Sequence, residues 1–170
     1  MGTREQLEIS QPRLIVAGYT AGDEAAATRH IEELAAIGIP APATVPAFQD
    51  LDPALLTAAE TIEVNGAGTS GEVEPVIIRH DGRFFLAVGS DHTDREVERV
   101  DIAAAKAACP KPVGAAVVEL GPDLAGVDWE SLVARSWVDG RLYQEGPLSV
   151  LRRPADPVVG CSNSRPASRT

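Results

Sequence analysis

Two Asp-Gly pairs do most to limit what this chain can fold into, because each stands between two segments of strand type. Asp-Gly is a strong hairpin signal, since both residues tolerate the positive φ angles of a tight type I′ turn. We therefore expect antiparallel hairpins turning at Asp81-Gly82 and at Asp139-Gly140. The predicted strands are residues 72–80 with 83–89, and residues 132–138 with 141–144.

The first third of the chain mixes a strand with a helix. Residues 13–17 are a short β-branched run, which predicts a strand. Asp23 is the predicted N-cap of a helix whose apolar stripe ends before Gly38. The proline-rich segment 39–48 is expected to run extended, and Asp52-Pro53 is expected to start a brief helical turn through Ala58. Residues 61–64 are predicted to form a strand, and residues 95–108 are partly helical in pattern. Together with the hairpins, these patterns predict an α+β fold that is mainly β.

The charge balance limits the partners of this chain. Fifteen basic against 25 acidic side chains give a net charge of −10, which argues against nucleic acid and an anionic membrane as partners. The longest uncharged stretch, residues 34–49, contains three prolines and is not a membrane-spanning helix. Small molecules and metal cations suit such a chain better. Two cysteines and a start unlike a signal peptide predict a cytoplasmic location.

Glu72 and Glu74 lie two apart on a predicted strand, so both carboxylates project from one face. Two readings stay open, because Glu is usually exposed to solvent. If the pair is buried, a divalent cation is the simplest way to neutralise it, and a third carboxylate is then needed. Asp91, after the second strand of the first hairpin, can supply that carboxylate or can instead cap a turn.

Three further side chains are candidates for catalysis. His30 and Glu33 lie three apart on the predicted helix and share a face, where they form either an exposed ion pair or a dyad that activates water. Lys106 stands among small apolar residues, where its ammonium either snorkels to solvent or faces developing negative charge.

In chain order, these signals resemble the fumarylacetoacetate hydrolase family, closest to its uncharacterised bacterial DUF2848-like branch. The family pattern has an N-Y…H-x-x-E segment, a proline-rich approach to a Phe, an E-x-E strand, an N-D-x-S-A-R-D segment, a lysine before C-P-x-G-P and a V-N-G-x-x-R-Q hairpin. The matching parts of this chain are Gly18-Tyr19, His30 to Glu33, the segment ending at Phe48, Glu72 to Glu74, residues 90–96, Lys106 before Cys109-Pro110, and residues 138–144.

This resemblance implies a mixed β-roll of stacked sheets with a few peripheral helices, which associates as a homodimer. It implies a metal-dependent hydrolase or lyase that cleaves a C–C bond in a small 2-oxo or 1,3-dicarbonyl acid of acylpyruvate type, with decarboxylation and isomerisation as related reactions. The cofactor is Mg²⁺ or Mn²⁺. The implied metal ligands are Glu72, Glu74 and Asp91; the catalytic residues are His30, Glu33 and Lys106; the substrate-binding residues are Arg95, Tyr19 and Gln144.

The end of the chain departs from the family pattern. The closing G-D-V-I…T-G-T-P-x-G strand has no counterpart after Leu151, where four arginines stand against one acid. We therefore expect a domain over residues 1–150, incomplete at its C-terminal side, and a disordered or aberrant tail over 151–170. The alternative function is an inactive or truncated relative that binds an oxo acid or a protein partner only.

Overall fold

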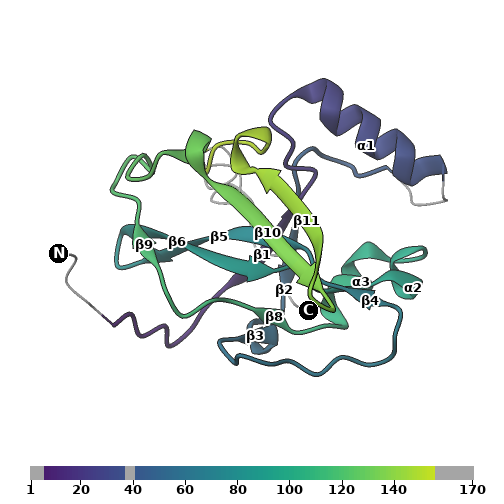
Figure 1. Ribbon diagram of the computed structural model, residues 1–170, viewed down its shortest axis with the longest axis horizontal. Helices are drawn as coiled ribbons and strands as arrows, with labels where there is room; N and C mark the ends of the chain where they lie inside the picture. Colours follow the sequence, from purple (N-terminus) through teal and green to yellow (C-terminus); the bar gives the residue numbers. More distant parts are fainter. Residues whose placement is uncertain (1–5, 37–40, 156–170) are drawn as a thin grey trace, which may run out of the picture.

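The central feature of the fold is an antiparallel sheet built on the first predicted hairpin (Figure 1). The computed structural model describes residues 6–36 and 41–155. Strand β5 (Val73–His80) pairs with β6 (Arg83–Ser90), and β9 (Val118–Glu119) adds to the other edge of β6. Asp81 and Gly82 have φ angles of 49° and 77°, which confirms the tight turn predicted from their residue types.

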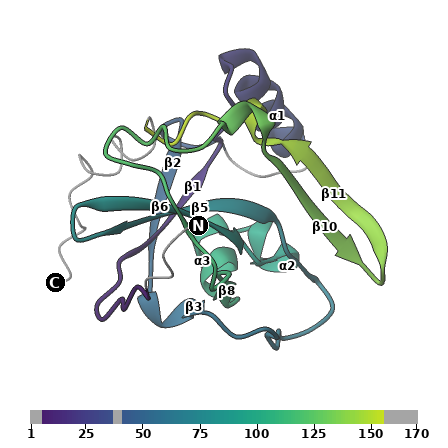
Figure 2. The same ribbon diagram turned by 60° about the vertical axis from the view of Figure 1, so that its left-hand side comes forward.

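The second predicted hairpin is also present. Strand β10 (Val133–Val138) pairs with β11 (Arg141–Pro147) around Asp139 and Gly140, whose φ angles are 51° and 75°. A register shift between Ser136 and Trp137 marks a bulge. Within the described residues these two strands form a sheet of their own, and Figure 2 shows them extending to one side of the central sheet.

The first third of the chain forms the strand and the helix that its pattern predicts. Strand β1 (Leu14–Gly18) pairs antiparallel with β2 (Ala47–Leu51), and α1 (Glu24–Ala36) lies between them in sequence. Asp23 caps the helix, since its Oδ1 accepts a hydrogen bond of 2.8 Å from the Ala26 N–H. The structure therefore confirms the coarse fold class, α+β and mainly β.

Short elements complete the described chain. Two small sheets pair β3 with β8 in parallel and β4 with β7 antiparallel. The expected helical turn at Pro53 is a 3₁₀ turn that ends at Leu55, and the strand expected at residues 61–64 is absent from the described elements. The remaining bounds are β3 (Leu56–Thr57), β4 (Thr69–Ser70), β7 (Thr93–Asp94), α2 (Arg95–Glu98), α3 (Ile102–Ala107), β8 (Lys111–Pro112) and the 3₁₀ turns Pro53–Leu55, Trp129–Ser131 and Leu148–Val150.

The segment after residue 150 begins by pairing with the loop between β1 and α1. Leu151 forms a bridge with Ala21, and the Arg152 N–H donates a 2.7 Å hydrogen bond to the Thr20 carbonyl. The rest of the predicted tail, residues 156–170, lies outside the described residues. None of the helices in the described ranges is long and apolar enough to span a membrane.

The buried side chains divide into an apolar core and a polar cluster. The apolar core is small and includes Phe85 and Ala87, which alternate along the inward face of β6. The polar and charged side chains that are buried in the described part of the chain follow β6 or lie on β7, α3 and β8. They are Asp91, Thr93, Lys106 and Lys111. Buried charge is costly unless paired, so this cluster is where a functional site is sought.

Candidate functional site

The hairpin register places Asp91 directly beside Glu72. Val73 pairs with Ser90 at the open end of the hairpin, and one step further the Asp91 N–H donates a 2.9 Å hydrogen bond to the Glu72 carbonyl. Glu74 lies two residues along the same strand. The three carboxylates that the sequence singled out as metal ligands therefore come from two neighbouring strand ends of one sheet.

Glu74 carries the clearest electrostatic signature of this cluster. Burial raises the pKa of the Glu74 carboxyl to about 7, and the negative charges of Glu72 and Asp91 raise it further against the opposing effect of Lys106. A group with this pKa is partly protonated at neutral pH. The local surplus of negative charge at Glu74 would be relieved by a bound cation.

Helix α3 carries Lys106, whose side chain contacts Asp91. Asp101 caps this helix, its Oδ1 accepting a 2.9 Å hydrogen bond from the Ala104 N–H, and Lys106 lies in the last turn. The Lys106 ammonium donates to Asp91 Oδ2, and both side chains are only 10% exposed. The sequence left open whether the Lys106 ammonium reaches solvent or lies buried among negative charge. In the structure it is buried and faces the Asp91 carboxylate.

Lys111 belongs to the same cluster and was not singled out from the sequence. Its ammonium lies 3.4 Å from Asp91 Oδ1, and burial lowers the pKa of Lys111 while the Asp91 charge opposes that shift. The signal available in the sequence was its rarity, because Lys106 and Lys111 are the two lysines of the chain. Its contacts depend on long-range packing of β8, which no local pattern reports.

Arg95 links the cluster to α2. Asp94 caps that short helix through hydrogen bonds from the Glu96 and Val97 N–H groups, which fixes Arg95 at its first position. The ion pairs of the guanidinium join Nη2 to Glu72 Oε1 at 3.0 Å and Nη1 to Glu98 Oε2 at 2.8 Å, and Nε donates to Ser70 Oγ at 2.6 Å.

Tyr19 and Gln144 reach the same neighbourhood from distant parts of the chain. Burial raises the pKa of the Tyr19 hydroxyl, and so does the negative charge of Glu98, the carboxylate that Arg95 binds. Gln144 Oε1 accepts a 2.9 Å hydrogen bond from the Val73 N–H. Since Val73 lies between Glu72 and Glu74, the β10–β11 hairpin is tied directly to the strand that carries the two glutamates.

Comparison with known proteins shows the family to which this chain belongs. The family described as "Protein of unknown function (DUF2848)" matches residues 17–169. The chain is a DUF2848 protein. The predicted likeness to that branch is thereby confirmed, while the wider likeness to fumarylacetoacetate hydrolases is carried by the motifs alone. No curated protein and no solved structure matches the chain.

The proposed dyad of this DUF2848 protein lies on α1. Glu33 is exposed, and the side chain of His30 lies outside the described part of the structure. Helix α1 stands apart from α2 and α3 in both views (Figures 1 and 2). The catalytic role of His30 and Glu33 stays a prediction. The other predicted site residues are linked by the contacts described above; they are Glu72, Glu74, Asp91, Lys106, Arg95, Tyr19 and Gln144.

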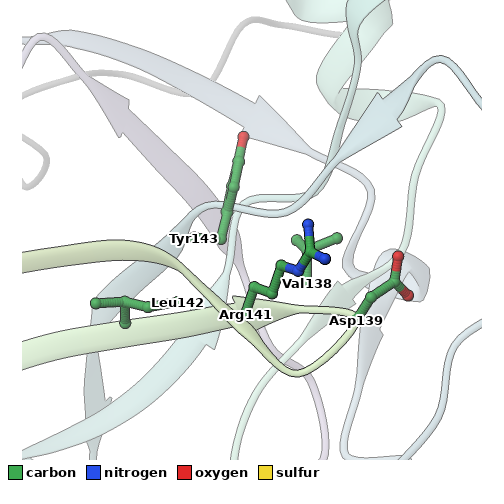
Figure 3. A pocket seen from close by; sticks show the side chains of 5 residues that line it. All are labelled: Val138, Asp139, Arg141, Leu142 and Tyr143. Atoms are coloured by element: carbon green, nitrogen blue, oxygen red, sulfur yellow. The ribbon is translucent and has the colours of Figure 1, made fainter.

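A pocket of about 450 Å³ lies at the tip of the β10–β11 hairpin (Figure 3), and none of the buried charged side chains lines it. It is formed by one turn and the strand ends beside it, and it contains none of the predicted site residues. Leu142 and Tyr143 are more than half exposed there. We place the candidate site at the carboxylate cluster instead, because buried charges and a shifted pKa mark chemistry better than a shallow surface hollow. The lining residues are Val138, Asp139, Arg141, Leu142 and Tyr143.

The cluster fits a hard divalent cation by its donor chemistry. Carboxylate oxygens are the ligands that Mg²⁺ prefers. Asp91 Oδ1 is buried and lies 3.4 Å from the Lys111 ammonium, so a cation at this oxygen would compete with a positive charge of the protein itself. In the ranges that the structure covers, no three acidic, histidine or cysteine side chains already stand in an arrangement that could hold a metal. The carboxylates of Glu72, Glu74 and Asp91 therefore lie on neighbouring strand ends, but their oxygens do not surround one point.

Proposed function

We propose that this DUF2848 protein is a divalent-metal-dependent hydrolase or lyase of fumarylacetoacetate hydrolase type. Its proposed substrate is a small 2-oxo or 1,3-dicarbonyl carboxylic acid, in which it cleaves a C–C bond as in acylpyruvates. The observation that carries the proposal is the hairpin register, which gathers Glu72, Glu74 and Asp91 at the open end of β5 and β6. The proposal includes the mixed β-roll and the homodimer that the resemblance implies.

Glu72, Glu74 and Asp91 are the residues that would hold Mg²⁺ or Mn²⁺. When bound, such a cation would supply positive charge that polarises the paired oxygens of an oxo acid and favours C–C cleavage. Glu74 is suited to this role because its carboxyl has a pKa of about 7 and stands beside two other carboxylates.

The cationic side chains position the anionic oxygens of the substrate. Each of them already forms an ion pair with one of the carboxylates, Lys106 with Asp91 and Arg95 with Glu72. An incoming carboxylate would share these cations, because an ammonium or guanidinium can serve more than one oxygen. Tyr19 and Gln144 are proposed to orient the substrate, and His30 with Glu33 to take a proton from water.

Metal titration by calorimetry tests this proposal. The wild-type protein is expected to bind Mg²⁺ or Mn²⁺, and Glu74→Gln to weaken that binding by at least about tenfold, since it removes a charged ligand. Glu63→Gln is the matched control, because Glu63 is an exposed glutamate outside the cluster. Wild-type protein that binds neither cation, or equal binding by Glu74→Gln, would overturn the metal site. Hydrolysis of an acylpyruvate by the loaded protein is the second readout.

One observation favours the alternative function, a relative that binds an oxo acid without turning it over. Lys106 and Lys111 already neutralise Asp91 through ion pairs within the protein. In that case the cationic groups would bind the acid directly. Titration with oxalate in the absence of divalent cations separates the two functions, because the enzyme is expected to bind oxalate strongly only when Mg²⁺ or Mn²⁺ is present.

A further inference from the structure

The outer half of the β10–β11 hairpin is exposed along its whole length. Its residues 137–143, here called the hairpin tip, start at the bulge between Ser136 and Trp137. On the inner side of the bulge, Gln144 is half-buried and its side chain binds the Val73 N–H. On the outer side, four large apolar side chains are each more than half exposed, and the ring of Tyr143 projects clear of the ribbon (Figure 3). They are Trp137, Val138, Leu142 and Tyr143.

The apolar surface of the hairpin tip has the size of an interaction site. Two aromatic and two aliphatic side chains at half exposure present on the order of 300 Å². Contiguous apolar patches of about 300–600 Å² are the largest that monomeric proteins usually expose, and they are often functional. A standard interface buries about 800 Å² per partner, and roughly half of that area is apolar. The tip therefore supplies most of the apolar surface that one such interface needs.

The distribution of charge favours a second copy of this chain as the partner. The chain has a net charge of −10, so two copies repel each other across most of their surfaces. The hairpin tip differs, because its one acid, Asp139, and its one base, Arg141, give it no net charge. In a two-fold contact the same patch meets itself, so Asp139 faces Arg141 of the partner subunit and both pairs are of opposite charge. A cationic partner would instead bind the acidic remainder of the surface.

We propose that the hairpin tip is the contact surface of a homodimer in which each copy covers the exposed aromatic side chains of the other. The inference rests on the homodimer of the proposed function, to which it assigns a surface, and it involves neither a cation nor a substrate. The pocket of about 450 Å³ that the tip residues line is closed by the second copy. Because Gln144 joins the hairpin to Val73, association also steadies the strand that carries Glu72 and Glu74.

Sedimentation velocity over a range of protein concentrations tests the proposal, and two valines form a matched pair. Val138 lies on the hairpin tip and Val118 on β9, and they are 52% and 55% exposed. Tyr143→Ser is expected to raise the dissociation constant of the dimer by at least about tenfold, since central aromatic side chains dominate interface energies. Val138→Ser is expected to raise it by about threefold or more. Val118→Ser is expected to leave it within about twofold.

Quenching of tryptophan fluorescence by acrylamide gives a second readout on the protein without metal. The chain has two tryptophans; Trp129 is 5% exposed and Trp137 is 58% exposed. A change of quenching with protein concentration therefore reports on Trp137. We expect quenching of the wild type to decrease as its concentration rises, because the second copy covers this ring. In Tyr143→Ser the quenching is expected to stay high, while circular dichroism is unchanged.

The outcomes separate this inference from the enzyme activity proposed above. A wild-type dimer that Tyr143→Ser and Val138→Ser leave unchanged, or that Val118→Ser weakens as much as Val138→Ser, overturns the assignment of the hairpin tip alone. If Tyr143→Ser does not fold, Val138→Ser decides. Wild-type protein that stays monomeric at every concentration overturns this inference and the homodimer with it. The proposed activity is judged independently, by metal titration and acylpyruvate hydrolysis.

Discussion

The two hairpins of this protein use the same turn and end in opposite environments. Both turn at Asp-Gly with two positive φ angles. The β5–β6 hairpin gains β9 as a third strand and buries charged groups at its open end, whereas the β10–β11 hairpin pairs with no third strand in the described chain and exposes Trp137 and Tyr143. Turn chemistry thus fixes the pairing of two strands, but the neighbouring elements decide which side chains are buried.

The largest expected effect is at the buried end of β5–β6. Asp91→Asn leaves two buried ammonium groups without their carboxylate, which is expected to lower the free energy of unfolding by about 3–5 kcal/mol. Asp139→Asn at the turn of the other hairpin is the control, because Asn tolerates the same positive φ. Urea unfolding measures both. Equal effects of the two changes would remove the contrast between the hairpins.

The second prediction concerns pH. Glu74 has a pKa of about 7 in the folded protein against 4.5 as its ordinary value, so the folded state holds a proton that the unfolded state releases. Stability is therefore lost as the pH rises from about 4.5 to about 7. Glu74→Gln is expected to raise the free energy of unfolding at pH 8 by up to about 3 kcal/mol, with little change at pH 4. Glu145→Gln on the other hairpin is the control; a gain that does not vary with pH would contradict the prediction.

The third prediction tests the link between the hairpins. Gln144→Ala removes the acceptor of the Val73 N–H and is expected to cost about 1 kcal/mol of stability. Hydrogen exchange at the Val73 amide is expected to accelerate in this variant. Ser136→Ala serves as the comparison, because Ser136 lies beside Gln144 and makes only a long 3.4 Å contact with it. An unchanged Val73 exchange rate would show that the two hairpins fold independently.

The smallest effect on monomer stability is expected at the exposed hairpin. Trp137 is 58% exposed, so Trp137→Ser is expected to change the free energy of unfolding by no more than about 0.5 kcal/mol. Sedimentation of the same variant tests the proposed homodimer, since exposed aromatic side chains are typical of interfaces. A dimer that is weakened by Trp137→Ser, and not by Val100→Ser at another exposed site, would assign the hairpin to the interface.

Local chemistry explains which parts of the fold were predictable. A two-residue turn at Asp81-Gly82 fixes the register, so that Glu72 faces Asp91 once both strands are extended. The Asp23 cap is equally local, because its acceptor and donor lie three residues apart. The strand expected at residues 61–64 was wrong, because residue type favours an extended chain but a strand also needs a partner.

The unpredicted part of the site depends on contacts between distant segments. Lys111 reaches Asp91 only because β8 pairs with β3, more than fifty residues earlier in the chain. Likewise, the link from Gln144 to Val73 spans 71 residues. The sequence could suggest the identity of Asp91 and Lys106, whereas the arrangement around them arises from packing that has no local signature.

Because both lysines are buried, the folded protein exposes no lysine amine to reagents in solution. Lys106 and Lys111 are 8% and 3% exposed, and the chain has no other lysine. Amine-reactive dyes and cross-linkers would find no lysine target on the native molecule and would acylate these side chains only after it opens. The rate of such labelling is therefore a direct measure of how often the folded protein opens.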